Sequence, residues 1–189
     1  MSSLLKEKVT EAGGNIEDLV VLEIGAGSGM VGKALADLGV KSIVGIDIVP
    51  EAKEVAEREY PGVYENYYIE NLIDLSETTQ EALANRGFNC IVCVSALGFN
   101  HIPAQAWAKA FNMIAPNSLV AFNVQKERWE DNSENSFLAW HPWVGEKNIF
   151  EITETHEYQH RIYMDGRPLY YIAIIGKKQT RNKSTEIGF

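Results

Sequence analysis

Short hydrophobic runs rich in valine and isoleucine recur along the chain, and longer amphipathic stretches separate them. Four runs have the length of a buried strand: residues 19–24, 42–46, 88–94 and 119–124. The stretches with a helical pattern cover residues 30–38, 51–59 and 104–114. Because the apolar residues in the runs follow one another instead of alternating with polar ones, each strand is expected to be covered on both faces. The pattern therefore predicts an α/β fold with a doubly wound, mostly parallel sheet.

The last third of the chain has a different pattern, with two β-prone runs joined by a tight turn. Residues 150–163 and 168–176 are rich in β-branched and aromatic residues, and Asp165-Gly166 lies between them. Asp-Gly between two such runs is a strong signal for a β-hairpin. We therefore expect the sheet to end in an antiparallel hairpin, with residues 1–178 forming one domain and residues 179–189 a polar tail.

Residues 125–148 have an ambiguous pattern. They hold three of the four tryptophans, Trp129, Trp140 and Trp143, next to an acidic stretch. Aromatic side chains of this size usually serve burial. The segment is predicted either to form a helix packed on the sheet or to cover a functional site, and the sequence leaves both possibilities open.

Length and composition favour a single domain. The 189 residues, 46% of them hydrophobic, suffice for one well-buried core but not for two ordinary domains. A formal net charge of -9 disfavours nucleic acids and anionic membranes as partners. The first residues contain no apolar run of signal-peptide length, and no later stretch is long and apolar enough to span a membrane, so we expect a cytoplasmic protein. The oligomeric state cannot be inferred from these properties.

The cysteines and the paired histidines favour packing over a metal site. Cys90 and Cys93 lie three apart in a predicted strand, so their side chains are expected on opposite faces of the sheet. No second cysteine pair accompanies them in the sequence. His156 and His160 are expected on one face of a predicted strand, but the sequence offers no evident third ligand. We therefore predict no metal site.

A glycine-rich turn directly follows the first predicted strand and leads into a predicted helix. The turn contains Gly25, Ala26, Gly27, Ser28 and Gly29. Glycine lets a ligand approach the backbone closely, and the N-terminus of the following helix offers N–H groups without intrahelical partners. The turn is therefore a candidate nucleotide-binding loop.

Asp47 ends the second predicted strand, about twenty residues after the loop, where dinucleotide-binding folds place a ribose-binding acid. A carboxylate at this position can accept hydrogen bonds from both ribose hydroxyls. The alternative is an aspartate that only caps the following helix. Its combination with the glycine loop favours ribose binding.

The glycine pattern by itself is compatible with two kinds of cofactor. Residues 27–32 also satisfy the G-x-G-x-x-G pattern of dinucleotide-binding folds. In those folds, however, the first glycine follows the strand immediately, and here that glycine is Gly25. A dehydrogenase also needs a second mononucleotide half, for which 189 residues leave little room. An NAD-dependent oxidoreductase is therefore the weaker alternative.

Extended by one acidic residue, the loop resembles motif I of class I S-adenosylmethionine-dependent methyltransferases. That motif reads acidic-x-Gly-x-Gly-x-Gly, and residues 23–29 read EIGAGSG, with Glu23 as the acid. Asp47 resembles the ribose-binding acid of motif II, and residues 88–94 and 116–120 resemble the motif IV strand and the turn into the fifth strand.

The similarity covers roughly residues 15–178 and implies a seven-stranded Rossmann-like sheet whose last two strands are antiparallel. Residues 158–161, with the Gly-Arg and Tyr-Tyr pairs that follow, more narrowly resemble bacterial methyltransferases described as TPR-repeat-associated. No TPR repeat is present in the sequence.

The resemblance implies S-adenosylmethionine as the cofactor and gives the loop residues a role. Gly25, Ala26, Gly27 and Gly29 would pass near the methionine moiety. Glu23 would order water or the ammonium group of the cofactor.

The same resemblance assigns the remaining cofactor contacts. Asp47 would hold the ribose, and Ile48 would pack against the adenine. Asn71 would lie near the adenine amine, with Leu72 offering backbone contacts, and Ser95 would lie beside the methyl donor. Asn71 and Ser95 are equally compatible with purely structural positions, a loop cap and a strand end.

The expected activity is methyl transfer to a small-molecule acceptor. Residues 94–101 depart from the Asn/Asp-Pro-Pro-Tyr/Phe motif of enzymes that methylate exocyclic amines of DNA or glutamine amides. His101 follows the motif IV strand at the rim where substrates bind, and its side chain suits a general base, although it also fits an ordinary helix start. Besides the oxidoreductase, a non-catalytic module that only binds S-adenosylmethionine is a further alternative.

Overall fold

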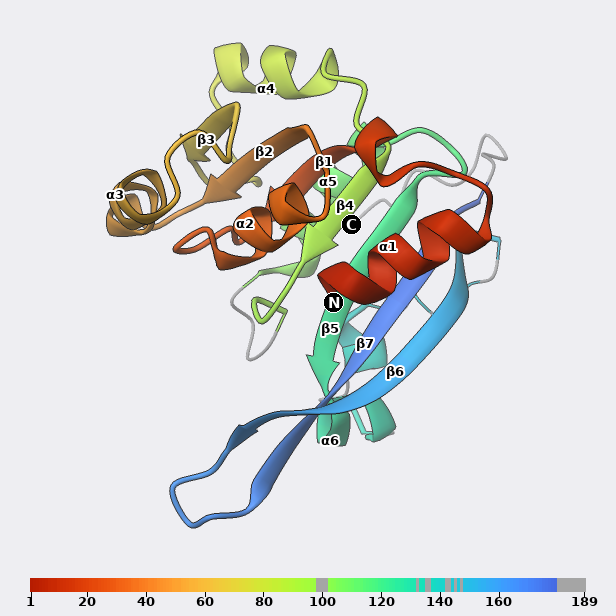
Figure 1. The fold of residues 1–189 in the computed structure, drawn as a ribbon. Coiled ribbons are helices and arrows are strands. Elements are labelled where there is room, and N and C mark those ends of the chain that lie inside the picture. The colour runs from red at the N-terminus through yellow and green to blue at the C-terminus, as the bar shows by residue number, and fades with distance from the viewer. Residues whose placement is uncertain are drawn as a thin grey trace.

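A seven-stranded sheet with the strand order β3-β2-β1-β4-β5-β7-β6 organises the chain (Figure 1). The computed structural model describes residues 1–97, 102–131, 133–134, 137–141, 144, 146 and 148–179. The parallel strands are β1 (Val20–Ile24), β2 (Ser42–Asp47), β3 (Asn66–Ile69), β4 (Cys90–Cys93) and β5 (Leu119–Gln125). The hairpin strands β6 (Phe150–Ile162) and β7 (Pro168–Lys178) are antiparallel to each other, and β7 is antiparallel to β5. The predicted α/β class, mostly parallel sheet and terminal hairpin are thus confirmed.

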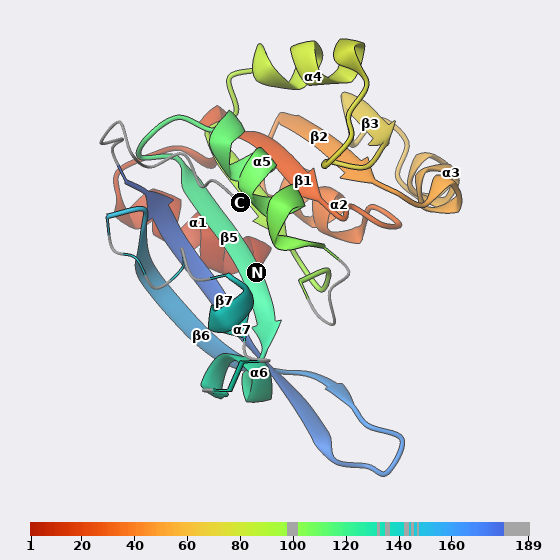
Figure 2. The same cartoon turned by 180° about the vertical axis from the view of Figure 1, so that it is seen from behind.

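Helices cover both faces of this sheet. The helical elements are α1 (Ser2–Glu11), η1 (Ile16–Asp18), α2 (Met30–Asp37), α3 (Pro50–Glu59), α4 (Glu77–Ala84), α5 (Ala104–Met113), α6 (Lys126–Glu130) and α7 (Phe137–Trp140). Figure 1 shows α1 and α2 in front of the sheet, and Figure 2 shows α5 on the reverse face. Within the described ranges, no helix is both long and apolar enough to cross a membrane.

The two faces of the parallel strands build two separate apolar cores. Leu22 and Ile24 of β1 belong to the core that contains Trp107 of α5. Val21, between them in sequence, belongs to the core that contains Leu5 of α1. This division explains the continuous apolar runs in the sequence, because every residue of such a strand meets a helical layer.

The described part of residues 125–148 packs on the sheet. Phe137 of α7 is buried, and its ring stacks on Phe122 of β5 with a centroid distance of 5.6 Å. The ring of Trp129 lies 6.0 Å from that of Phe137. Of the two possibilities that the sequence left open, the described residues fit the packing helix.

The cysteines lie where the strand periodicity places them. Cys93 belongs to the core beside α5 and Cys90 to the core beside α1, and both are free thiols. Burial raises the pKa of both thiols above the usual value. Among the described residues, no group of three or more His, Cys, Asp or Glu side chains is arranged to hold a metal ion.

A buried lysine joins the last strand to α5. Lys178 of β7 is only 3% exposed. Its Nζ donates hydrogen bonds to the carbonyls of Phe111 (2.7 Å) and Ile114 (2.8 Å). These carbonyls lie at the end of α5, where backbone acceptors lack intrahelical partners and the helix dipole favours a cation.

Replacing Lys178 with methionine should therefore destabilise the fold, because the side-chain volume is kept while two buried acceptors lose their donor. We expect the free energy of unfolding, measured with urea, to fall by about 1–3 kcal/mol. Lys177→Met at the neighbouring, less buried position is the matched control and should change it by less than about 0.5 kcal/mol. Equal effects of the two substitutions would contradict the role of Lys178.

Candidate active site

A cavity of about 420 Å³ opens at the carboxyl ends of β1, β2 and β4. The strand order changes direction between β1 and β4, which is where open α/β sheets bind their ligands. Six of the predicted cofactor-binding residues line the cavity: Gly25, Asp47, Ile48, Asn71, Leu72 and Ser95. The structure thus brings together, around one space, residues from four separate parts of the sequence.

The glycine loop is fixed to the end of β2. The backbone amides of Gly25 and Ala26 donate hydrogen bonds to the carbonyl of Ile46, at 2.9 and 3.2 Å. Gly25 has a φ of +65°, and a Cβ atom on it would lie 2.7 Å from the Cβ of Ala96. Glycine is therefore required at this position both by conformation and by space.

Asp47 holds the same loop with its side chain. Its Oδ2 accepts a hydrogen bond from the amide of Gly27 at 2.8 Å, and its Oδ1 accepts one from the amide of Val49 at 3.0 Å. A carboxylate has about four acceptor positions, so two backbone donors leave capacity for the hydroxyls of a ribose. The structural and the ligand-binding interpretations of Asp47 are therefore compatible.

The outer wall of the cavity is unusually apolar for an exposed surface. Ile48 is 64% exposed and Val49 is 45% exposed, and both line the cavity. On the other side, Oδ1 of Asn71 accepts a hydrogen bond from the amide of Ile73, which fixes the turn that carries Leu72. A flat apolar ligand group such as adenine could cover Ile48 while its polar edge reaches this turn.

Glu23 lies behind the loop and is not among the residues that line the cavity. It is 2% exposed, and its Oε2 accepts a hydrogen bond from the hydroxyl of Tyr64 at 2.9 Å. Burial raises the pKa of Glu23 to about 8; the bond from Tyr64 opposes this effect and the charge of Asp47 adds to it. The predicted contact of Glu23 with the cofactor or with ordered water stays a prediction.

A second tyrosine supports the loop beside Tyr64. The hydroxyl of Tyr67 donates a hydrogen bond to the carbonyl of Gly27 at 2.6 Å, and the rings of Tyr64 and Tyr67 meet edge to face at 5.1 Å. Neither support was predicted from the sequence. The available signal was Glu23 itself, because a carboxyl group inside an apolar strand requires a buried partner.

Beyond the cavity, a chain of hydrogen bonds links β4, β5 and β6. The amide of Ser95 lies 2.6 Å from Oδ1 of Asn123, and Nδ2 of Asn123 lies 2.6 Å from the hydroxyl oxygen of Tyr158. A backbone amide can only donate, so the Asn123 side chain must present its oxygen to Ser95 and its NH₂ group to Tyr158. The hydroxyl hydrogen of Tyr158 is then directed elsewhere.

His160 reaches Ser95 from the hairpin. Its Nε2 lies 3.4 Å from Oγ of Ser95, and its ring packs 4.4 Å from that of Tyr171. The β6–β7 register shifts between Gln159 and Arg161, so His160 is the extra residue of a β-bulge, a feature that often re-aims side chains near functional sites. From the sequence, His160 was expected only as a partner of His156 and as part of the segment 158–161 that carries the narrower resemblance, with no contact to Ser95.

Three other predicted residues, Ala26, Gly27 and Gly29, are not among those that line the cavity, and one predicted residue cannot be placed. Ala26 is buried within the loop, Gly27 is bonded to Asp47 and Tyr67, and Gly29 has a φ of +83° as the N-cap of α2. His101, the predicted general base, lies outside the described residues.

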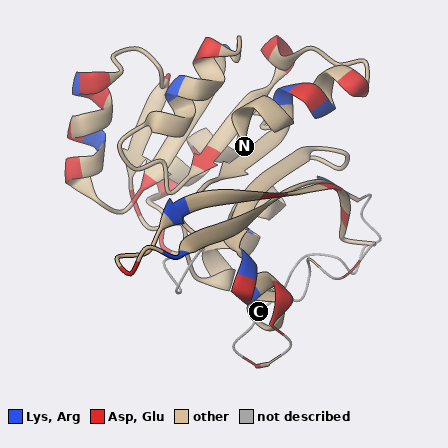
Figure 3. Cartoon of the chain, turned by 60° about the horizontal axis from the view of Figure 1, so that its bottom comes forward, with Lys and Arg blue, Asp and Glu red and all other residues tan. Residues whose placement is uncertain are grey.

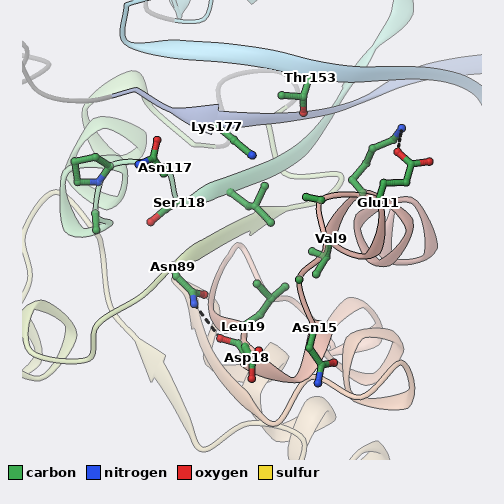
Figure 4. A pocket seen from close by; sticks show the side chains of 16 residues that line it. Val9, Glu11, Asn15, Asp18, Leu19, Asn89, Asn117, Ser118, Thr153 and Lys177 are labelled. Atoms are coloured by element: carbon green, nitrogen blue, oxygen red, sulfur yellow. Dashed lines mark hydrogen bonds and ion pairs between the residues drawn. The ribbon is translucent and has the colours of Figure 1, made fainter.

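A larger cavity, of about 630 Å³, lies at the opposite end of the parallel strands, where they begin (Figure 4). Leu19 and Asn89 line it near the amino ends of β1 and β4, and Val9 and Lys177 contribute from α1 and β7. Figure 4 shows the side chain of Asn89 bonded to the carbonyl of Asp18, at 2.9 Å. Since ligands of open α/β sheets bind at the carboxyl ends of the strands, the smaller cavity is the candidate active site.

Comparison with known proteins identifies the family. A family model described as "Methyltransferase domain" matches residues 1–169 of the chain. The chain belongs to this methyltransferase family. No curated protein matches the chain at a significant level.

Solved structures of methyltransferases share the fold. A SAM-dependent methyltransferase from Methanosarcina mazei is 19% identical with a TM-score of 0.62, and the match covers 85% of this chain and 92% of that one. The N-methyltransferase NodS from Bradyrhizobium japonicum, in complex with S-adenosyl-L-homocysteine, is 18% identical with a TM-score of 0.63. The match covers 94% of this chain and 84% of that one. A Pyrococcus horikoshii protein provisionally described as an RNA methyltransferase is 16% identical with a TM-score of 0.64. The match covers 94% of this chain and 83% of that one.

The protein is thus an S-adenosylmethionine-dependent methyltransferase, and the oxidoreductase and non-catalytic alternatives are set aside. The cavity fits the cofactor. At Gly25 a side chain would fill the space against Ala96, and the exposed Ile48 offers an apolar surface to an adenine. The resemblance inferred from motif I is confirmed.

Asp47→Ala should weaken binding of S-adenosylhomocysteine at least tenfold in calorimetry. The substitution removes a charged acceptor, worth about 1.5–3 kcal/mol, and also releases the amide of Gly27. Asp37→Ala, at an exposed ion pair with Lys33, is the control and should leave the affinity unchanged. Unchanged affinity in Asp47→Ala would remove the ribose assignment.

Glu23 should make stability depend on pH. The pKa of Glu23 is 4.5 in the unfolded chain and about 8 in the folded protein. At a pH between these two values, Glu23 has lost its proton in the unfolded chain but keeps it in the folded protein. The free energy of unfolding should therefore fall as pH rises through this window, by an amount on the order of a few kcal/mol. Denaturation of the wild type and of Glu23→Gln from pH 5 to pH 8.5 measures the difference. An equally steep fall in Glu23→Gln would show that another group is responsible.

Proposed function

We propose that this methyltransferase acts on a small-molecule acceptor bound beside Ser95. The observation that carries the proposal is the position of Ser95, which lines the cofactor cavity and also contacts Asn123 of β5 and His160 of β6. The Ser95 hydroxyl and the His160 imidazole offer hydrogen-bonding atoms, and the rings of His160 and Tyr171 add an aromatic surface. Such sites hold small ligands by a few directed contacts.

Charge supports a small acceptor over a nucleic acid. The formal net charge is -9, and Figure 3 shows acidic segments along several helices with shorter basic segments among them. A phosphate backbone would be repelled by the average field of such a surface. The likeness to a Pyrococcus horikoshii protein described as an RNA methyltransferase is at 16% identity and carries only the fold.

The residues of the cavity would bind and orient the reactants. When bound, S-adenosylmethionine supplies a methyl group on a positively charged sulfur. The glycine loop would hold the methionine moiety, Asp47 the ribose, and Ile48 the adenine, with Asn71 and Leu72 at the adenine edge. Holding acceptor and methyl carbon close and in line can contribute roughly 7–11 kcal/mol to lowering the barrier.

A base is needed only where the acceptor must lose a proton. His101 remains the prediction from sequence for this role. The proposal itself does not depend on which base is used, because amines that are already neutral react without one.

A screen with methyl-labelled S-adenosylmethionine tests the acceptor class. The library should contain small hydroxy, amino and thiol compounds together with total RNA and a protein extract. We expect label transfer to one or more small compounds. Gly25→Ala, whose added Cβ would meet Ala96, is the control and should lose transfer through lost cofactor binding. Transfer only to RNA or to protein would overturn the proposal.

A further inference from the structure

We propose that His160 receives the proton that the acceptor releases, with the hydroxyl of Ser95 passing it between them. This inference rests on the proposed function, because it requires an acceptor O–H or N–H group beside Ser95. It assigns to β6 a part in the chemistry that the glycine-loop motif and the other strand motifs do not indicate.

Ser95 lies between the cofactor cavity and the imidazole of His160. Ser95 lines the cavity, and its Oγ lies 3.4 Å from Nε2 of His160. A hydroxyl can accept one proton while it donates another, so this side chain can connect the cavity to the imidazole. Catalytic hydrogen bonds are often this long before the reactants bind.

Ser95 is held in a backbone conformation that serine rarely adopts. Its φ is +62°, in the left-handed region, which is costly for a residue with a side chain. The bond from its amide to Asn123, a residue that is 1% exposed, fixes the peptide in place. Such strain at the end of a central strand is typical of residues that are positioned for a reaction.

Aromatic and charged groups surround His160. Tyr158 and Arg161 lie on its own strand, Tyr171 packs on its ring from β7, and Ser95 approaches from the end of β4. Charges on α6, from Arg128 and Glu127, act on Tyr171 behind it. Burial first, and the charge of Arg161 second, lower the pKa of His160, so its imidazole is neutral and able to accept a proton at neutral pH.

In the proposed reaction the acceptor gains the methyl group and loses one proton. A lone pair of the acceptor atom forms the new bond to the methyl carbon, and the carbon–sulfur bond breaks with its electrons remaining on sulfur. The acceptor proton passes to Oγ of Ser95 as the serine proton moves to Nε2 of His160. The imidazolium subsequently releases its proton to water.

Nuclear magnetic resonance can test this position without any acceptor. S-Adenosylmethionine carries a positive charge on sulfur, whereas S-adenosylhomocysteine carries none there. If His160 lies beside the reacting centre, its pKa, followed through the ring C–H resonance, should be about 0.5 lower with the first ligand than with the second. His156, an exposed histidine of the same strand, is the control and should give the same pKa with both. His160→Asn and His156→Asn assign the two signals.

The outcomes separate this inference from the proposed function. Equal His160 pKa values with both ligands, when calorimetry shows that both bind, would overturn the role of His160 and leave the small-molecule proposal standing. With the acceptor that the screen identifies, His160→Asn should abolish the rise of the single-turnover rate with pH, while His156→Asn should keep it. A retained rise in His160→Asn would assign the base elsewhere, with His101 the next candidate.

Discussion

The attachment of the glycine loop to the end of β2 determines the geometry of the whole cavity. Gly25 and Ala26 bind the carbonyl of Ile46, and the amide of Gly27 binds the carboxylate of Asp47. The loop that follows β1 is therefore held by the neighbouring strand and not by its own helix alone. Because β4 lies on the other side of β1, the space between the loop and Ser95 forms where the strand order reverses.

A layer of tyrosines behind the loop makes this attachment rigid. Tyr67 binds the carbonyl of Gly27, and Tyr64 binds the buried carboxyl group of Glu23. The carbonyl of Gly27 and the carboxyl group of Glu23 are thus bonded within the protein, on the side of the loop away from the cavity. A site organised in this way loses little conformational entropy when the cofactor binds.

Local patterns allowed the central sheet and the loop to be predicted, but not the contacts between distant elements. Continuous apolar runs indicated β1, β2, β4 and β5, whereas β3 is short and only partly buried, so it gave no such signal. Gly25 and Asp47 were found because their spacing follows from the β-turn-α unit. The contact between Ser95 and His160 spans 65 residues and depends on a bulge in β6, which no local spacing indicates. Tyr64 and Tyr67 escaped for the same reason.

The place of β7 in the sheet has a consequence for synthesis on the ribosome. β7 is the last described strand in the chain, yet it lies inside the sheet, between β5 and β6, and Lys178 ties it to α5. Until β7 has emerged, one edge of β5 has no partner, and its apolar residues Val120 and Phe122 lack part of their cover. The nascent chain therefore passes through a stage with an open, aggregation-prone edge, which closes only when β7 is delivered.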